Sequence, residues 1–446
     1  MGRLFGTDGV RGVANVDLTA DLAMRLSAAA VRVLRTTDRA ERPLVVVGRD
    51  TRPSGEFLEA AVVAGLAASG ADVLRMGVAP TPAVAHAIAQ AGAALGVMLS
   101  ASHNPMPDNG IKVFGAGGLK LPDEVEDEIA ARLDERPAAP PTGADVGRVR
   151  DDGLLVDAYI DHLLTALPAP LTGLRVVVDC AEGAASVLAP RVLRAAGAEV
   201  LAIHANGDGN RINAGCGATH TETLRAAVLE HGADAGIAHD GDADRCLAVA
   251  ADGSDIDGDQ ILALCALGLR ERGQLRHDTV AVTVMSNLGF HHAMRDAGIS
   301  VVTTPVGDRY VLEAMHRHDL SLGGEQSGHV VFRDYATTGD GLLTALQVLG
   351  RMAETGQPLD ELAKVMIRLP QVLINVTGVD RTRVHTSPEL AAALAAAEAE
   401  LGDEGRVLLR PSGTEPLVRV MVEAPTERVA QTVAGSLAAA VSRSLG

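Results

Sequence analysis

Lysine is scarce in this sequence, which contains only Lys112, Lys120 and Lys364. All the other basic residues are arginine, and alanine is abundant in the segments that look helical. We attribute this bias to the base composition of the genome rather than to chemistry. It makes the three lysines worth locating.

Cysteine is also rare. The four cysteines, Cys180, Cys216, Cys246 and Cys265, lie far apart in the sequence and form no CxxC pair. Structural zinc sites and the disulfide frameworks of small secreted proteins usually show closely spaced cysteines. The sequence therefore suggests neither kind of site.

Long apolar runs are missing. The first residues, MGRLFGTDGV, lack the apolar segment of a signal peptide, and no stretch reaches the ~20 apolar residues that span a bilayer. We therefore expect a cytoplasmic protein that has no membrane partner.

Positive charge is in deficit, with 39 Lys and Arg against 57 Asp and Glu and a formal net charge of -18. Nucleic acids and anionic lipids are bound through clustered Lys and Arg that neutralise their phosphates. The charge argues against nucleic acid as a partner. A small anionic substrate is not excluded, because local arginines can create a positive pocket inside an acidic protein.

The chain has 446 residues, of which 47% are hydrophobic and 22% charged, so it is long enough for several hydrophobic cores. The segment 136–149 is rich in Pro and Gly and indicates a linker. We place four domains at residues 1–150, 151–254, 255–368 and 369–446.

One pattern occurs three times, from Pro43, Leu174 and Thr279: a β-rich run, a polar turn, a helix, a break and a second β run. A buried strand before a helix of period 3.6 and another buried strand is typical of a βαβ unit. After Leu369 the pattern indicates a helix, a β-hairpin and a final amphipathic helix. We predict three similar α/β domains with mixed sheets and a smaller C-terminal α+β domain.

Each repeat continues through another helix into a strand that ends in an unusual loop. Ligands gather at strand ends in α/β folds, so three such loops with different polar residues predict one site between three domains.

The first of these loops contains Ser102, His103 and, further on, Lys112. A serine beside a histidine and near a lysine is suited to be a nucleophile or phosphate carrier. An ordinary Ser/Asn/Pro turn explains the same residues, and both interpretations stay open.

The second loop carries Asp240, Asp242 and Asp244 at alternating positions, followed by Arg245. Alternate residues of an extended segment project to one side, so three carboxylate oxygens can reach one hard divalent cation. An EF-hand is excluded because its twelfth position is Ala251 rather than Glu. We predict a metal site, with a solvated acidic turn as the alternative. Asp255, Asp257 and Asp259 also alternate, but we expect them to cap a helix.

The third loop holds Glu325 and Ser327, which suit sugar hydroxyls, and a Gly-rich turn is the alternative. Nearby, Asp308 either faces a ligand or caps a helix. The C-terminal motif RPSGTEP, residues 410–416, offers a guanidinium, hydroxyls and backbone N–H groups for a phosphate dianion, and a plain hairpin turn is the alternative.

Together these loops resemble the α-D-phosphohexomutase superfamily. The motifs SASHNP, DGDADR, GEQSGH and RPSGTEP occur in the family's order, and the match runs from Gly6 to the last helix. FGTDGVRG, VGDRYV and GGEQSGH are most similar to the bacterial members that act on glucosamine phosphates. The resemblance implies four domains around a central cleft, a homodimer, and reversible conversion of glucosamine 6-phosphate to glucosamine 1-phosphate, which supplies UDP-N-acetylglucosamine synthesis.

The resemblance also implies the role of each candidate residue. Ser102 is the phosphoserine, and one Mg²⁺ is bound by Asp240, Asp242, Asp244 and an oxygen of that phosphate. The catalytic groups are Ser102, His103, Lys112, Arg11 and Arg245; Glu325 and Ser327 hold the sugar; Arg410, Ser412, Gly413 and Thr414 hold the phosphate that does not react. A 1,6-bisphosphate is the intermediate and activator, and it turns end for end before it returns a phosphate to Ser102.

Two other functions share these motifs. A phosphomannomutase or phosphoglucomutase uses the same chemistry and differs in its contacts to the sugar. A non-catalytic sugar-phosphate sensor is the second, and the intact Ser102, Lys112 and aspartate trio argue against it.

Overall fold

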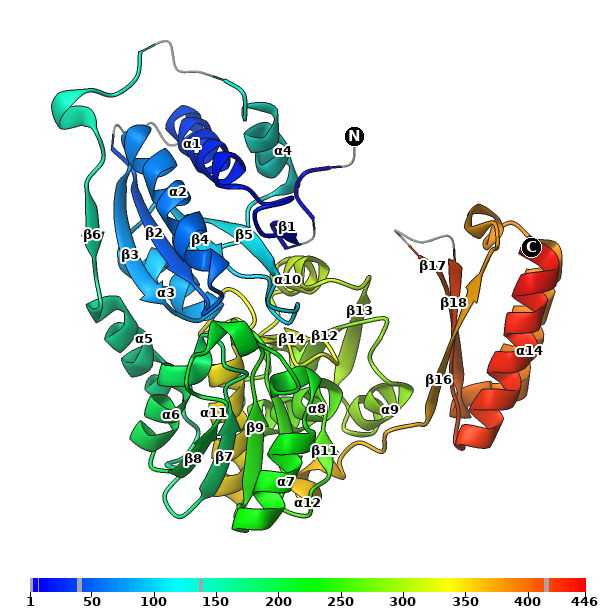
Figure 1. Cartoon of the computed structure of the whole chain (residues 1–446). Coiled ribbons are helices and arrows are strands. Elements are labelled where there is room, and N and C mark those ends of the chain that lie inside the picture. Colours follow the sequence, from blue (N-terminus) through cyan, green and yellow to red (C-terminus); the bar gives the residue numbers. More distant parts are fainter. Residues whose placement is uncertain (1–2, 7, 38–41, 136–138, 413–416) are drawn as a thin grey trace. The chain divides into compact units, whose positions relative to one another are not determined.

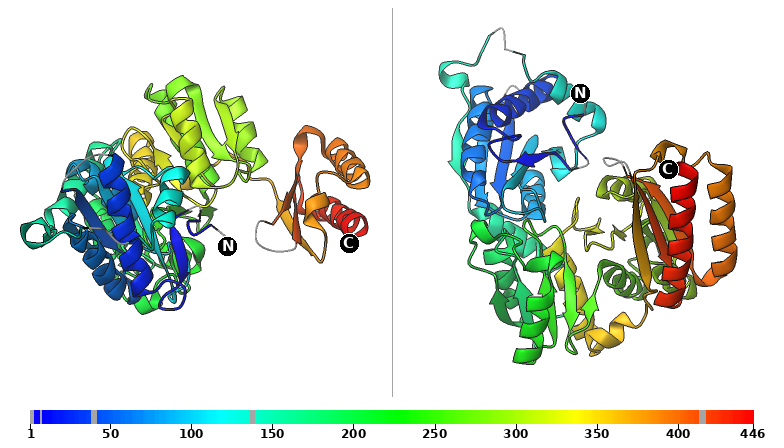
Figure 2. Two further views of the ribbon diagram at one scale, coloured as in Figure 1. Left: turned by 90° about the horizontal axis from the view of Figure 1, so that it is seen from above. Right: turned by 45° about the vertical axis from the view of Figure 1, so that its right-hand side comes forward.

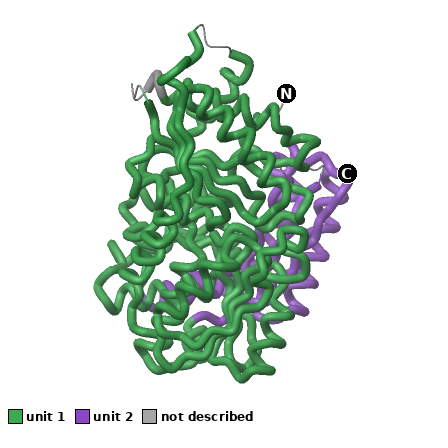
Figure 3. The backbone as a smooth tube through the Cα atoms, turned by 60° about the vertical axis from the view of Figure 1, so that its left-hand side comes forward, with its two compact units in different colours: residues 1–285, 299–365 green, residues 286–298, 366–446 purple. Residues whose placement is uncertain are grey.

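The computed structural model describes residues 3–6, 8–37, 42–135, 139–412 and 417–446. It consists of two compact units, coloured separately in Figure 3. Residues 1–285 and 299–365 form unit 1, and residues 286–298 and 366–446 form unit 2. Figure 1 labels the helices and strands along the chain.

Unit 1 contains three sheets built to one plan. Their strand orders are β1-β5-β4-β2-β3-β6, β11-β10-β9-β7-β8 and β13-β12-β14-β15. In each sheet a βαβ unit supplies two parallel strands, a third parallel strand follows on the other side, and the next strand runs antiparallel to that third strand. The predicted mixed sheets are therefore confirmed.

The first sheet and its helices comprise β1 (Val10–Val13), α1 (Ala20–Thr37), β2 (Leu44–Arg49), α2 (Ser54–Ala68), β3 (Asp72–Val78), α3 (Thr81–Gln90), β4 (Leu95–Leu99), β5 (Asp108–Gly115), α4 (Asp123–Ala131) and β6 (Val149–Asp151). The segment predicted as a linker ends in β6, which pairs in parallel with β3 at the sheet edge. Pairing partners far away in sequence, rather than local composition, decide whether such a segment becomes a strand.

The second sheet and its helices comprise α5 (Leu154–Thr165), β7 (Arg175–Asp179), α6 (Ala185–Ala195), β8 (Glu199–Ile203), α7 (Glu222–His231), β9 (Ala235–Ala238), β10 (Leu247–Ala250) and β11 (Asp255–Ile256). The third group comprises α8 (Gly258–Glu271), β12 (Thr279–Thr283), α9 (Leu288–Asp296), β13 (Ser300–Thr304), α10 (Asp308–Arg317), β14 (Leu322–Gly324), β15 (Val330–Phe332), α11 (Gly341–Thr355) and α12 (Leu359–Ala363).

Burial explains why the first strand of each repeat is a continuous β-branched run. Val45, Val46 and Val47 of β2 are fully buried, and so is the equivalent run in β7. A parallel strand covered on both faces has no solvent side, so its sequence does not alternate between apolar and polar residues. The helix cap predicted at Asp257 is also confirmed, because its side chain accepts hydrogen bonds from the first turn of α8 in a capping box with Gln260.

Unit 2 contains the smaller C-terminal domain. Its elements are β16 (Gln371–Thr377), α13 (Pro388–Leu401), β17 (Arg406–Pro411), β18 (Leu417–Glu423) and α14 (Glu427–Leu445), and the strand order is β16-β18-β17. All its strand pairs are antiparallel. Both helices pack on one face of this sheet (Figure 2), where their apolar residues join those of the strands in one core. The predicted α+β domain is confirmed.

Within the described part of the chain, every helix is too short or too polar to cross a bilayer.

Candidate active site

The three predicted loops occupy equivalent positions, each between the third parallel strand of its sheet and the antiparallel strand that follows it. Two of them touch directly: the Ser102 hydroxyl donates a 2.6 Å hydrogen bond to Asp240 Oδ2. Gly241 permits this approach, because a Cβ at that position would lie 2.5 Å from the carbonyl oxygen of Ser102. The fold thus brings the serine of one domain onto the aspartates of the next.

Ser102 itself is held in an unusual conformation. Its φ is +51°, in the left-handed region that residues other than glycine rarely adopt. The residue is buried, and its hydroxyl also lies 3.3 Å from His103 Nδ1. Burial, with the nearby Arg245 and Arg11, lowers the pKa of His103 to about 4, so this histidine is neutral near pH 7 and one ring nitrogen is free to accept a proton.

The three aspartates form a buried carboxylate cluster. One oxygen from each lies within 4.8 Å of the others. Asp242 Oδ1 and Asp244 Oδ1 are buried and accept no hydrogen bond from any residue that the structure describes. Burial and the neighbouring Asp244 and Asp242 raise the pKa of Asp240 above its ordinary value, because buried carboxylates this close together repel each other's negative charge. Its oxygen donors fit a hard divalent cation.

Lys112 is the principal cation of this cluster. Its ammonium group lies 2.8 Å from Asp242 Oδ2, 2.9 Å from Asp8 Oδ2 and 3.4 Å from Asp244 Oδ2. Burial would lower its pKa, but the three carboxylates raise it well above the ordinary value. Lys112 is therefore a fixed positive charge beside the serine and not a ready proton donor in this state.

Two arginines flank the serine. Arg11 pairs with Asp8 at 2.5 Å and donates a longer bond to the carbonyl of Ala101. Arg245 places its Nε 4.0 Å from Asp240 Oδ2 and 3.9 Å from Asp244 Oδ1, and this buried nitrogen has no hydrogen-bond partner among the described residues. Arg245 is thus positioned to bind a further acceptor such as a phosphate oxygen.

A cavity of about 440 Å³ opens onto these groups. Of the residues predicted from the sequence, it is lined by Arg11, Ser102, His103, Asp244, Arg245 and Glu325. Its size matches that of ordinary small-molecule sites, which run from about 300 to 1,000 Å³.

The third loop contributes Glu325, whose Oε1 accepts a 3.2 Å bond from the N–H of Gly307. Ser327 is half-buried and lies outside the lining found for this cavity in the described part of the chain. His329, which is buried, does line the cavity, and its Nε2 has no hydrogen-bond partner among the described residues.

Three further residues at the site, Thr81, Lys120 and Asp8, were not predicted as site residues. Thr81, at the start of α3, donates a 2.5 Å bond to Asp242 Oδ2. Lys120 binds Asp8 at 3.0 Å and also binds Asp308, which joins segments far apart in sequence. The helix-cap alternative for Asp308 is wrong, because the N-cap of α10 is Gly307 and the Asp308 carboxylate faces Lys120 and the cavity. The rarity of lysine was the one signal that pointed to Lys120.

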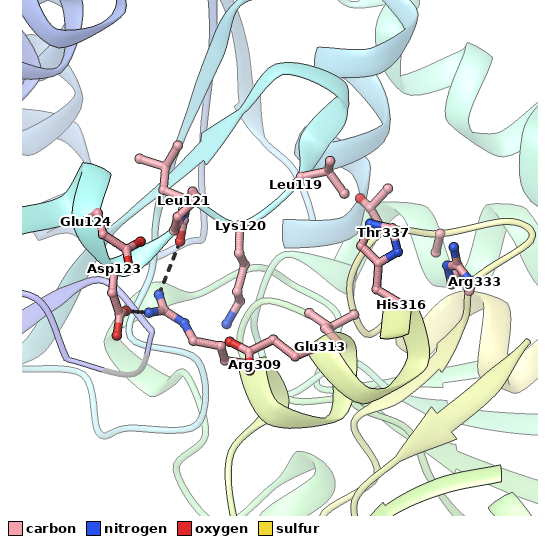
Figure 4. Close-up of a pocket in the computed structure, with 13 residues that line it drawn as sticks. Leu119, Lys120, Leu121, Asp123, Glu124, Arg309, Glu313, His316, Arg333 and Thr337 are labelled. Atoms are coloured by element: carbon pink, nitrogen blue, oxygen red, sulfur yellow. Dashed lines mark hydrogen bonds and ion pairs between the residues drawn. The ribbon is translucent and has the colours of Figure 1, made fainter. Parts of the chain in front are cut away.

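Lys120 also lines a larger cavity of about 570 Å³, shown in Figure 4. The view shows Lys120 extending toward α10, with Arg309 bound to Asp123 and to the carbonyl of Leu121. None of the predicted catalytic residues lines this cavity. The cavity is connected to the site through Lys120. This residue binds both Asp308 and Asp8, and Asp8 in turn binds Lys112.

Removing that connection should impair the site. We expect Lys120→Met to lower kcat/KM by roughly 10- to 100-fold, because Asp8 and Asp308 lose their shared cation. The matched control is Lys364→Met, since Lys364 is exposed and pairs with Glu361, three residues earlier in the chain. The steady-state rates of the two variants are compared after correction for the folded fraction of each. Equal rates would show that Lys120 does not contribute to the site.

The C-terminal motif belongs to unit 2. Arg410 lies in β17 opposite Arg419 of β18, and the N–H of Ser412 donates to the carbonyl of Leu417, which closes the hairpin. Arg381 donates to the carbonyl of Ser412. Gly413 and Thr414 lie outside the described residues.

A second group with metal-ligand chemistry contains Asp179, His204 and Cys216. Hydrogen bonding explains it, because the Asp179 carboxylate accepts bonds of about 3 Å from His204 Nδ1 and from the N–H groups of Ala181 and Gly217. Burial and Asp179 raise the pKa of the Cys216 thiol to about 12, so it is protonated in this state.

Comparisons with protein families identify the family of the chain. Models of phosphoglucomutase/phosphomannomutase α/β/α domains I, II and III match residues 2–139, 157–253 and 257–369, and the C-terminal domain model matches residues 373–440. The chain therefore belongs to the phosphoglucomutase/phosphomannomutase family of isomerases.

Several curated proteins are similar to this chain over its full length. Phosphoglucosamine mutase of Frankia alni is 73% identical over 451 residues, which cover 100% of this chain and 99% of the relative. The phosphoglucosamine mutase of Saccharopolyspora erythraea is 64% identical over 442 residues, with 99% of each chain covered. Among solved structures, a phosphoglucomutase/phosphomannomutase family protein of Burkholderia thailandensis superposes with a TM-score of 0.83 at 25% identity and covers 99% of this chain and 97% of its own.

Proposed function

We propose that this chain is a phosphoglucosamine mutase that interconverts glucosamine 6-phosphate and glucosamine 1-phosphate through a phosphoserine at Ser102. The observation that carries the proposal is the hydrogen bond from Ser102 to Asp240, in a carboxylate cluster that also binds Lys112, next to a cavity lined by Ser102, Arg11 and Arg245. The name shared by the curated relatives supports the amino sugar as substrate.

The chemistry is two phosphoryl transfers in opposite directions. In the first, the bond between Ser102 Oγ and phosphorus breaks, a bond to the free sugar hydroxyl forms, and the hydroxyl proton leaves with a nearby base. The product is a 1,6-bisphosphate, which turns end for end and returns its other phosphoryl group to Ser102. His103, whose Nδ1 lies 3.3 Å from the Ser102 hydroxyl, is the proposed base, while Arg245 and Lys112 offset the negative charge that spreads over the transferring group.

One Mg²⁺ fits the carboxylates of Asp240, Asp242 and Asp244, whose unbonded oxygens support a cation there. When bound, Mg²⁺ supplies charge neutralisation beside the phosphoserine. Thr81 and Lys112 hold Asp242 through its other oxygen, which orients the free one. In the resting protein Asp240 accepts the Ser102 hydroxyl and thereby aligns it with the cluster.

The remaining candidate residues are proposed to bind the sugar and the phosphate that does not react. Glu325 and Ser327 hold the sugar hydroxyls, and Glu325 is supported by its place in the cavity lining. Arg410, Ser412, Gly413 and Thr414 hold the phosphate that is not being transferred. A fixed site for that phosphate allows one serine to serve both ends of the bisphosphate.

The phosphate assignment predicts a specific defect. Arg410→Ala should lower kcat/KM by roughly 10- to 1000-fold, because two charge-assisted hydrogen bonds to phosphate are lost. The intermediate should also dissociate more often, so released 1,6-bisphosphate per turnover should rise. Arg419→Ala, on the neighbouring strand, is the control for loss of charge. If Arg410→Ala has a normal rate and a normal release of 1,6-bisphosphate, RPSGTEP is a plain hairpin turn and not a phosphate site.

Substrate preference is tested by a coupled assay of the purified protein on glucosamine, glucose and mannose 6-phosphates. We expect kcat/KM to be highest for glucosamine 6-phosphate. Higher values for glucose or mannose phosphate would instead identify a phosphoglucomutase or phosphomannomutase, and no turnover of any of them would indicate a sugar-phosphate sensor.

The same proposal includes the setting of the enzyme. We infer domains at residues 1–150, 151–254, 255–368 and 369–446, a homodimer, and a cytoplasmic location where glucosamine 1-phosphate feeds UDP-N-acetylglucosamine synthesis. The 1,6-bisphosphate acts as activator because it phosphorylates Ser102 in enzyme that has lost its phosphate.

A further inference from the structure

Arg52 has the most unusual environment of any charged residue near the site. It is the largest of the fully buried side chains in the described part of the chain. A buried guanidinium is costly unless its N–H groups are all paired. The function proposed above gives Arg52 no role, and it does not line the cavity.

The hydrogen bonds of Arg52 converge on one loop. Its Nη1 donates to the carbonyls of Pro105 at 2.6 Å and Asp108 at 2.9 Å, and its Nη2 donates to those of Ser102 at 2.9 Å and Asn104 at 2.8 Å. The remaining group, Nε, donates to Asp50 Oδ2 at 2.9 Å. A guanidinium has five N–H donors in a rigid plane, so this arrangement uses the whole group.

Asp50 holds the backbone N–H of Ser102 through the hydroxyl of Ser100. Its Oδ2 accepts a 2.6 Å bond from the Ser100 hydroxyl, whose oxygen accepts the N–H of Ser102 at 2.9 Å. The N–H of Ser102 is thus fixed through Asp50, and its carbonyl is fixed by Arg52 and by Asn213 Nδ2, also at 2.9 Å.

These contacts account for the conformation of Ser102. A residue other than glycine at φ +51° costs of order 1 kcal/mol and persists only where its surroundings determine it. In that conformation the Ser102 hydroxyl reaches Asp240. A phosphoryl acceptor displaced by about 1 Å loses roughly 100-fold in rate, so a device that fixes its position affects catalysis directly.

We propose that Arg52 is a positioning residue that organises residues 102–108 and presets Ser102 for phosphoryl transfer. This inference rests on the proposed function, and it adds a requirement on the turnover step. Because Arg52 contacts backbone carbonyls and not the cavity, its loss should lower kcat while the KM for glucosamine 6-phosphate stays near that of the wild type.

The test uses Arg52→Lys and Arg52→Gln in the full chain. Lysine keeps the charge but cannot reach carbonyls spread along the loop, so we expect kcat to fall roughly 10- to 100-fold in Arg52→Lys and further in Arg52→Gln, with KM within about threefold. The rate at which added 1,6-bisphosphate phosphorylates Ser102, followed by intact mass, should fall in proportion. Both measurements are scaled to the folded fraction from thermal unfolding.

The matched control is Arg351→Gln. Arg351 is also largely buried, with 11% of its side chain exposed, but it binds Glu271 and Glu354 on helices α8 and α11. It should lose stability and keep kcat per folded molecule.

Several results would overturn the proposal: a kcat in Arg52→Lys within threefold of the control, a fall in kcat matched by an equal rise in KM, or failure of both Arg52 variants to fold, which would assign the residue to the fold alone. Wild-type protein that turns over none of the sugar phosphates would instead refute the proposed function.

Discussion

Ser102→Ala should abolish mutase activity and leave the protein folded. The hydroxyl is the proposed carrier of the phosphoryl group, so we expect kcat to fall by at least about 10⁴-fold. The hydroxyl makes one bond to Asp240, whose loss costs on the order of 1 kcal/mol, so the thermal midpoint should change little.

Two measurements accompany that variant. Intact mass should show a phosphorylated fraction in active wild-type protein and none in Ser102→Ala. Ser254→Ala is the control, because Ser254 is an exposed serine whose hydroxyl binds Asp252 in a surface turn. Turnover of Ser102→Ala within about tenfold of wild type would remove Ser102 from the chemistry.

The metal cluster predicts an effect of similar size. Treatment with EDTA should abolish the activity of the wild-type protein, and addition of Mg²⁺ should restore that activity. Asp242→Asn should weaken metal binding and reduce kcat by at least about 100-fold, because the variant loses one of three carboxylate ligands and the charge that faces Lys112.

Metal affinity is measured directly by titration with Mn²⁺, so that the readout does not depend on turnover. Asp255→Asn provides the control, since Asp255 belongs to a second alternating trio but lies exposed and bound to Thr221 and Arg225. Full activity of metal-free wild-type protein, or unchanged Mn²⁺ affinity in Asp242→Asn, would contradict the metal site.

The repeat architecture was predictable because its signals are local. Runs such as Val45 to Val47 carry the burial pattern of parallel strands, and the polar loop after each third parallel strand is visible without knowledge of the fold. The alternating aspartates do converge, but the expected extended segment is wrong: residues 241–243 form a turn, with Ala243 at φ +56° and its N–H bonded to the carbonyl of Asp240. For these features the chain neighbours of a residue are also the neighbours that decide its role.

The supporting residues were not predictable for the opposite reason. Arg52 lies in a charged, Pro-containing segment that resembles an exposed turn, yet its partners at residues 102–108 lie about fifty positions away and bury it completely. Asp308 was open to two interpretations because its partner, Lys120, comes from another domain. Tertiary contacts decide such cases, and sequence periodicity carries no record of them.

The most direct test of the account follows one phosphoryl group. Enzyme carrying radioactive phosphate on Ser102 is mixed with unlabelled glucosamine 6-phosphate for a single turnover, and protein and sugars are separated. The account predicts that the label leaves the protein and appears in glucosamine 1-phosphate, because the serine gives its phosphate to C1 and takes back the one from C6. Formation of glucosamine 1-phosphate while the label stays on the protein would contradict it.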